Sequence, residues 1–139
     1  MYNSTYIATV SSYLDRLQVF KQVFSEHIKS CERIVRGKSL ASENTTALYG
    51  YLLRNLARFV PFSAEFTDIN APEEYANMHA EIAAGLVSYE RALTHILVAM
   101  HGTQLDQRQF MIGVSEQQRA LDSINFDYFD NIRYWAEAD

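Results

Sequence analysis

The chain has 139 residues and a formal net charge of −5, with 48% hydrophobic and 21% charged residues. This length fits one domain, residues 1–139, that can bury a core without disulfides or metals. The net charge argues against general nucleic-acid binding, which needs a dense basic face. No apolar run approaches the roughly 18 residues that a membrane span needs, so we expect no membrane partner. The single cysteine, Cys31, excludes an internal disulfide and favours a reducing, cytoplasmic location.

Apolar residues recur at helical spacing along most of the chain. In the first segment an apolar row repeats every seven residues, and a second row follows it three residues later. The pattern predicts helices over residues 4–36, 44–60 and 72–101, and a fourth helix that begins near residue 103. No alternating run of β-branched residues flanked by turn residues competes with this interpretation.

Pro61 is expected to end the second helix, because a proline ring removes a backbone donor and restricts the preceding residue. The second helix would then be about half as long as the others. Residues 61–71 would form an irregular strap over the core. Short connections join antiparallel neighbours, so the sequence predicts an all-α, up-down-up-down four-helix bundle. Gly50, Gly85 and Gly113 interrupt the helices, and we interpret them as points of close helix packing.

Metal binding is one hypothesis, because helical bundles often hold metals between facing helices. No glutamate is followed three residues later by histidine, and no pair of histidines is spaced four residues apart. His27 and Cys31 share one helix face, and His95 and His101 would lie at a similar level, but two ligands do not make a site. Phosphate-loop and nucleophile motifs are also missing from the sequence. We therefore expect no metal or cofactor, and we keep a metal protein or enzyme as a third alternative.

Polar residues on the buried stripes support a second alternative, a small-molecule-binding or sensory bundle. Its pocket would be lined by Lys21, Asn55, His79, Tyr89 and Glu90. The competing interpretation is that these residues specify helix register, with Lys21 paired to Glu90.

Basic residues gather near the first turn at Lys29, Arg33, Arg36 and Lys38, where Glu26 and Glu32 dilute their charge. This cluster is too small to predict nucleic-acid binding.

Most of the aromatic residues are expected to meet at the end of the bundle that holds the N-terminus, together with many carboxylates. Interface cores favour aromatic side chains, and carboxylates attract a basic partner. The leading hypothesis is therefore a non-catalytic protein-binding module, such as an adaptor, an immunity-type protein or a small inhibitor. The residues assigned to its binding surface are Tyr2, Phe62, Phe66, Tyr75, Asp127, Phe129, Asp130, Tyr134 and Trp135. We also expect a homodimer, because the wide stripe on the first helix could serve a second copy and symmetric dimers are common.

Overall fold

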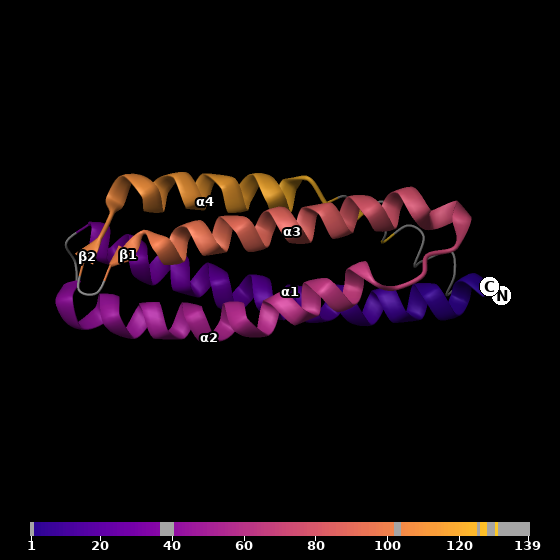
Figure 1. Cartoon of the computed structure of the whole chain (residues 1–139), viewed down its shortest axis with the longest axis horizontal. Coiled ribbons are helices and arrows are strands. Elements are labelled where there is room, and N and C mark those ends of the chain that lie inside the picture. Colours follow the sequence, from indigo (N-terminus) through magenta and orange to yellow (C-terminus); the bar gives the residue numbers. More distant parts are fainter. Residues whose placement is uncertain (1, 37–40, 102–103, 125, 128–129, 131–139) are drawn as a thin grey trace.

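In the part of the chain that the structure describes, four long helices lie side by side with their axes nearly parallel (Figure 1). The computed structural model describes residues 2–36, 41–101, 104–124, 126–127 and 130. The helices are α1 (Tyr2–Val35), α2 (Ala41–Thr67), α3 (Ala76–Val98) and α4 (Gln107–Asp122). A short 3-10 helix, η1 (Glu73–Tyr75), precedes α3. The predicted all-α helical bundle is therefore confirmed.

Each helix in Figure 1 runs opposite to the helix that precedes it in the chain. Helices that are consecutive in sequence make the closest contacts, and α3 packs most extensively against α4. Two strands of two residues each, β1 (Met100–His101) and β2 (Gln104–Leu105), pair antiparallel between α3 and α4. This short hairpin was not predicted, because two residues per strand are too few to leave an alternating pattern in the sequence.

The predicted short second helix and the strap over residues 61–71 are wrong. Helix α2 continues through Pro61 as far as Thr67, and only the residues between Asp68 and Pro72 connect it to η1. The proline ring is exposed, so it meets solvent rather than the core. Continuing the helix buries Phe62 and Phe66 in line with Phe59. Burial of each large aromatic side chain contributes about 1.5–3 kcal/mol, which offsets the roughly 3 kcal/mol cost of a proline inside a helix.

The third and fourth helices also begin later in the sequence than predicted. Pro72 and the 3-10 turn stand before α3, which begins at Ala76. Helix α4 begins at Gln107, because the Asp106 carboxylate accepts a hydrogen bond from the Gln109 backbone N–H (3.1 Å) and caps the helix.

The core is built from the predicted apolar rows, with aromatic rings at its centre. Phe59 is fully buried, and its ring centroid lies 5.2 Å from that of Phe20 and 5.4 Å from that of Tyr89. Phe24 and Phe62 complete this group at 5.9 and 5.7 Å from Phe59. Such edge-on and tilted pairs add to the free energy of area burial. The rings therefore tie α1, α2 and α3 together at mid-length.

Gly113 lies where α4 approaches α3 closely, and Gly85 lies where α3 meets the residues just after α4, as expected for these two glycines. A Cβ atom on Gly113 would stand 2.7 Å from Ile96 Cγ1 and 3.2 Å from the Ile96 backbone nitrogen. A Cβ atom on Gly85 would overlap the side chain of Ile124. Gly50 differs, because among the described residues the neighbour of its missing Cβ is Arg54 Nη1, at 3.5 Å.

Candidate functional site

The aromatic residues assigned to the N-terminal end are mostly buried where the structure describes them. Phe62 and Phe66 are only 2% and 0% exposed, so they belong to the core and are not available to a partner in this state. Tyr75 is half-buried and stacks on Tyr6 with ring centroids 5.7 Å apart. Phe129, Tyr134, Trp135 and the side chain of Tyr2 lie outside the described residues.

The acidic part of the same surface is exposed. Asp127 and Asp130 both face solvent, as do Glu65, Asp68 and Glu73 near the end of α2 and in η1. The end therefore presents carboxylates over a buried aromatic interior. The exposed carboxylates can attract a basic partner. Phe62 and Phe66 cannot anchor one, because they are buried.

The five residues of the polar-pocket alternative lie in different places. His79 Nε2 donates a hydrogen bond to the Phe66 carbonyl (2.8 Å), and its Nδ1 accepts one from the Tyr6 hydroxyl (2.8 Å). Because burial disfavours the charged imidazolium, the pKa of His79 is lowered, and desolvation raises the pKa of Tyr6 to about 12. His79 thus closes the C-terminal end of α2 and ties it to α1 and α3. Its polar atoms are already satisfied within the protein.

The other pocket residues do not join His79. Tyr89 is fully buried among Phe24 and Phe59, and Asn55 donates to the Tyr51 carbonyl one turn earlier on α2 (2.8 Å). The predicted pairing of Lys21 with Glu90 is wrong. The Lys21 ammonium lies instead over the Phe126 ring, 4.9 Å from its centroid. An aromatic face replaces the carboxylate as the partner of this cation.

Lys21 does line a groove of about 1120 Å³ between α1 and α4. Its walls also carry Lys29 from α1, Glu81 from α3, and Gln117 and Asp122 from α4. Asn55, His79, Tyr89 and Glu90 are not among its lining residues. The charges in the groove are mixed, so they define no single class of small-molecule ligand.

His27 and Cys31 pack as a buried pair. The Cys31 sulfur lies 3.8 Å from His27 Nε2, and the same nitrogen donates to the Leu48 carbonyl at 3.0 Å. Burial raises the pKa of the Cys31 thiol to about 12 and lowers the pKa of His27. A protonated thiol is a poor metal ligand. Within the described residues, no group of three or more histidine, cysteine or acidic side chains is arranged to hold a metal ion.

The basic cluster of α1 is partly neutralised by its own neighbours. Lys29 pairs with Glu26 at 3.8 Å, and Arg36 pairs with Glu32 at 3.9 Å. Arg33 is exposed, and Lys38 lies outside the described residues. No continuous basic face is formed by the described part of this cluster.

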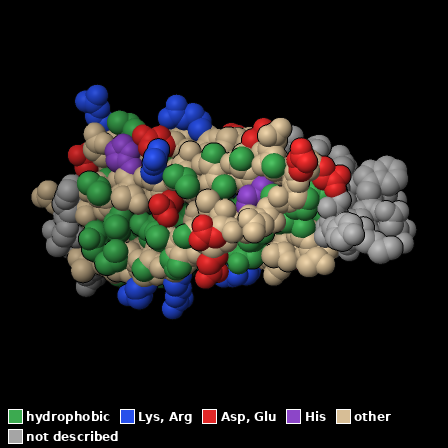
Figure 2. Space-filling model, turned by 45° about the vertical axis from the view of Figure 1, so that its right-hand side comes forward, with side chains coloured by type: hydrophobic (Ala, Val, Ile, Leu, Met, Phe, Trp, Pro, Cys, Tyr) green, Lys and Arg blue, Asp and Glu red, His purple; other side chains and the backbone are tan. Residues whose placement is uncertain are grey.

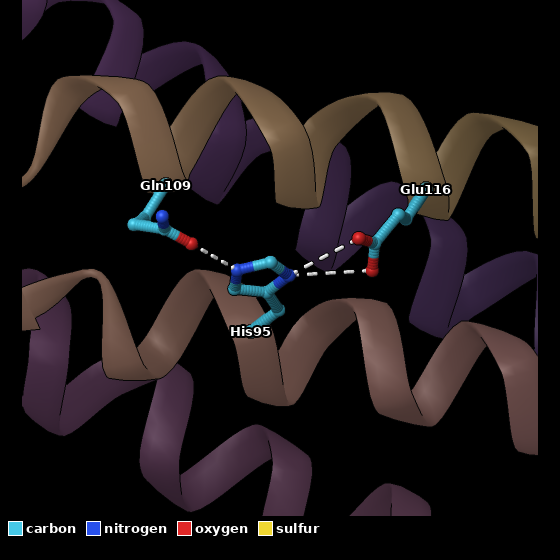
Figure 3. Close-up of polar contacts among 3 residues, drawn as sticks. All are labelled: His95, Gln109 and Glu116. Carbon is cyan, nitrogen blue, oxygen red and sulfur yellow. Dashed lines mark hydrogen bonds and ion pairs between the residues drawn. The ribbon is translucent and has the colours of Figure 1, made fainter.

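His95 is the centre of a polar cluster between α3 and α4 that sequence reasoning missed (Figure 3). Its Nε2 lies 2.6 Å from Gln109 Oε1, and its Nδ1 lies 3.2 Å from a Glu116 carboxylate oxygen. The Gln109 amide presents its oxygen to Nε2, and Glu116 accepts from Nδ1; with this amide orientation both ring nitrogens donate, as in the imidazolium form. The hydrogen bonds to Gln109 and then to Glu116 raise the pKa of His95 above its usual value. With both nitrogens engaged, the ring clamps α4 to α3 and leaves no free lone pair for general-base chemistry.

This clamp predicts a pH-dependent contribution to stability. Because the pKa of His95 is raised in the folded state, its contribution is fully present below the unfolded value of about 6.5 and is lost as pH rises through the folded pKa. Glu116→Gln is expected to lower the free energy of unfolding by about 0.5–1 kcal/mol at pH 6 and by much less at pH 9. Urea unfolding of the wild type and of Glu116→Gln at each pH measures the difference in the free energy of unfolding. His27 and His79 are the same in both proteins, so their opposite pH dependence cancels in this difference. An equal difference at both pH values would contradict a charged clamp.

The described residues also form an exposed apolar surface on the outer faces of α2 and α3. On α2 it comprises a row at alternating steps of three and four residues, which we call the α2 outer row: Gly50, Leu53, Ala57, Val60, Ala64 and Thr67. The corresponding α3 outer row is Ala80, Ala84, Val87, Arg91, Thr94 and Val98, in which Arg91 and Thr94 interrupt the apolar side chains. Leu53, Val60 and Val98 are 45%, 44% and 58% exposed. Hydrophobic side chains gather at the lower left of Figure 2, over α2 and α3.

The spacing of the α2 outer row is the same heptad spacing that defines the core. The inward row of α2 contains Leu52, Leu56, Phe59 and Phe66, all buried. A helix with two apolar seams can pack on two sides at once. The signal was present in the sequence, but the assumption that α2 stops at Pro61 shortened the outer row to a few residues.

Within the described residues, no helix has the length and hydropathy to cross a membrane. Comparison of the chain with protein-family models, curated proteins and solved structures gave no match, so the function is argued from the geometry of the protein itself.

Proposed function

We propose that this chain is a non-catalytic protein-binding module that takes up a partner helix on the face formed by α2 and α3. The observation that carries the proposal is the α2 outer row, an exposed heptad seam with the spacing of a coiled-coil interface. A helix laid against such a seam inserts apolar residues at every third or fourth position. The lone thiol, buried and protonated, accords with a cytoplasmic setting for such a module.

Two features support a binding role for this face over a role in the core. Leu53 and Val60 are nearly half exposed although each is large and apolar, and they stand in line on one side of the helix. Small side chains at Gly50, Ala57 and Ala64 alternate with them, which leaves room for another helix to approach. Scattered exposed apolar residues need no explanation, but contiguous exposed apolar surface is typical of interaction sites, which supports the proposal.

The exposed carboxylates near the end of α2 suggest the electrostatic character of the partner. Glu65 and Asp68 flank the C-terminal part of the α2 outer row, and Glu73 follows in η1. They would attract a helix or surface that carries lysine or arginine and would make association salt-sensitive. The proposal therefore retains a partner with a basic surface.

Leu53→Glu tests the function, because it places a charge in the middle of the seam without touching the core. The immobilised chain would be used to capture proteins from a lysate of its source cells, followed by mass spectrometry. We expect proteins retained by the wild type to be reduced at least tenfold with Leu53→Glu, since a central apolar contact is worth about 2 kcal/mol or more.

Ala8→Glu on the exposed side of α1 is the matched control and is expected to capture the same proteins as the wild type. Circular dichroism of all three proteins is expected to remain helical. If Leu53→Glu stays folded and captures the same proteins as the control, the α2–α3 face does not bind a partner and the proposal is wrong.

A further inference from the structure

We infer that the helix that docks on the α2 outer row is α2 of a second copy of this chain, running antiparallel about a two-fold axis. The inference rests on the proposed function and names the occupant of the same face. Three independent features of the described residues favour a second copy over an unrelated helix. They are the order of side-chain sizes along the row, the position of one arginine, and the adjoining row on α3.

Side-chain sizes along the α2 outer row are self-complementary in the antiparallel direction only. With the two-fold axis between residues 58 and 59, Gly50 faces Thr67, Leu53 faces Ala64, and Ala57 faces Val60. Each small side chain meets a larger one, so the two helices fill the gap between them evenly. Parallel pairing would instead set Leu53 against Leu53 and Gly50 against Gly50, which alternates crowding with voids.

The charged residues beside the α2 outer row also favour antiparallel pairing. Arg54 Nη1 lies 3.5 Å from the position of a Cβ on Gly50, so its guanidinium stands level with Gly50 on the α2 axis. Antiparallel pairing brings Thr67 and the adjacent Asp68 of the second copy to that level. Both Arg54 and Asp68 are exposed, and Arg54 is in none of the ion pairs found among the described residues. By symmetry the pairing would form two Arg54–Asp68 ion pairs, one at each end of the seam.

The α3 outer row enlarges the contact. One helix pair alone buries less than the roughly 1,200–2,000 Å² of a stable interface. Helix α3 packs beside α2, and its outer row places Val87 and Val98 on the same apolar face, 36% and 58% exposed. An α2 helix seated between α2 and α3 of the other copy would cover both rows. Four helices, two from each copy, would then form the interface.

The first measurement is the mass in solution by light scattering at micromolar to millimolar concentrations. We expect the wild type to approach twice the 16.0 kDa of one chain as its concentration rises. Ala57→Glu places two carboxylates near the two-fold axis and is expected to keep the protein monomeric. Ala8→Glu carries the same change at an exposed alanine of α1 and is expected to dimerise like the wild type.

The second measurement is cross-linking with a short bismaleimide. Ala57→Cys is expected to give a covalent dimer, because the two copies of residue 57 lie within about one helical turn of each other. Gly50→Cys is expected to give none, because antiparallel helices place the two copies of residue 50 about 25 Å apart at 1.5 Å per residue. The native Cys31 is buried and its thiol pKa is raised, so the unsubstituted chain is the unlinked control.

The outcomes separate this inference from the proposed function. A monomeric mass at every concentration, with capture of a partner still dependent on Leu53, would overturn the inference and leave the function standing. A dimer that Ala57→Glu does not dissociate, or one in which Gly50→Cys cross-links and Ala57→Cys does not, would also overturn it. Concentration-dependent dimerisation that is lost in Ala57→Glu, with cross-linking at residue 57 alone, would establish it.

Discussion

Replacing Phe59 by alanine is expected to lower the free energy of unfolding by about 3–5 kcal/mol. Phe59 has no exposed surface, and its ring contacts the rings of four aromatic residues from three helices: Phe20, Phe24, Phe62 and Tyr89. The substitution removes the apolar area and also leaves a cavity that the surrounding rings cannot collapse to fill. Urea unfolding followed by circular dichroism measures the change.

Val60→Ala is the matched control, because it shortens the next residue of α2 on the exposed side. At low protein concentration its effect on the free energy of unfolding is expected to stay within about 0.5 kcal/mol. A loss below about 1 kcal/mol for Phe59→Ala would contradict the placement of this ring at the centre of the core.

Adding a single methyl group at Gly113 is expected to destabilise the protein, although alanine is the better helix former. The new Cβ would come within 2.7 Å of Ile96 Cγ1 and 3.2 Å of the Ile96 backbone nitrogen. A backbone atom cannot rotate away, so α4 must shift from α3. Overpacking of this kind costs about 1–3 kcal/mol, against a propensity gain of at most about 1 kcal/mol. Thermal and urea unfolding are both expected to show the net loss.

Gly50→Ala makes the same chemical change where, among the described residues, the nearest atom is the end of the flexible Arg54 side chain. It is expected to raise the free energy of unfolding by about 0.5–1 kcal/mol. Opposite signs for the two substitutions would confirm the close contact of α3 with α4. A stabilised Gly113→Ala variant would show that the two helices lie farther apart.

The fold class was accessible from the sequence because heptad rows of Leu, Ile and Phe report directly which helix side is buried. The second helix shows where this reasoning stops. Pro61 is a strong local signal for a helix end, but Phe62 and Phe66 add enough buried area to carry the helix past it. The local tendency of proline to end a helix conflicts here with the free energy gained by burying Phe62 and Phe66. The sequence alone does not show how large that gain is.

The candidate site was harder to predict for a related reason. Aromatic residues are favoured both in interfaces and in cores, so the composition of one end could not tell which applied to Phe62 and Phe66. The His79 contacts with Tyr6 and Phe66 span three helices, and the contacts of His95 with Gln109 and Glu116 span two. Spacing along one helix carries no information about such partners.

The arrangement in which each helix packs mainly against its neighbour in sequence has a consequence for how the chain folds. Contacts between consecutive helices close short loops, and proteins dominated by such contacts fold in microseconds to milliseconds. Helix α1 can pair with α2 as soon as Thr67 has left the ribosome, before α3 has emerged from it. The α3–α4 hairpin then adds as a unit already drawn together by the pairing of β1 with β2 and by its two glycines. Until that unit docks, the α1–α2 pair exposes the sides of Phe59 and Phe66 that pack on Tyr89 and His79 of α3.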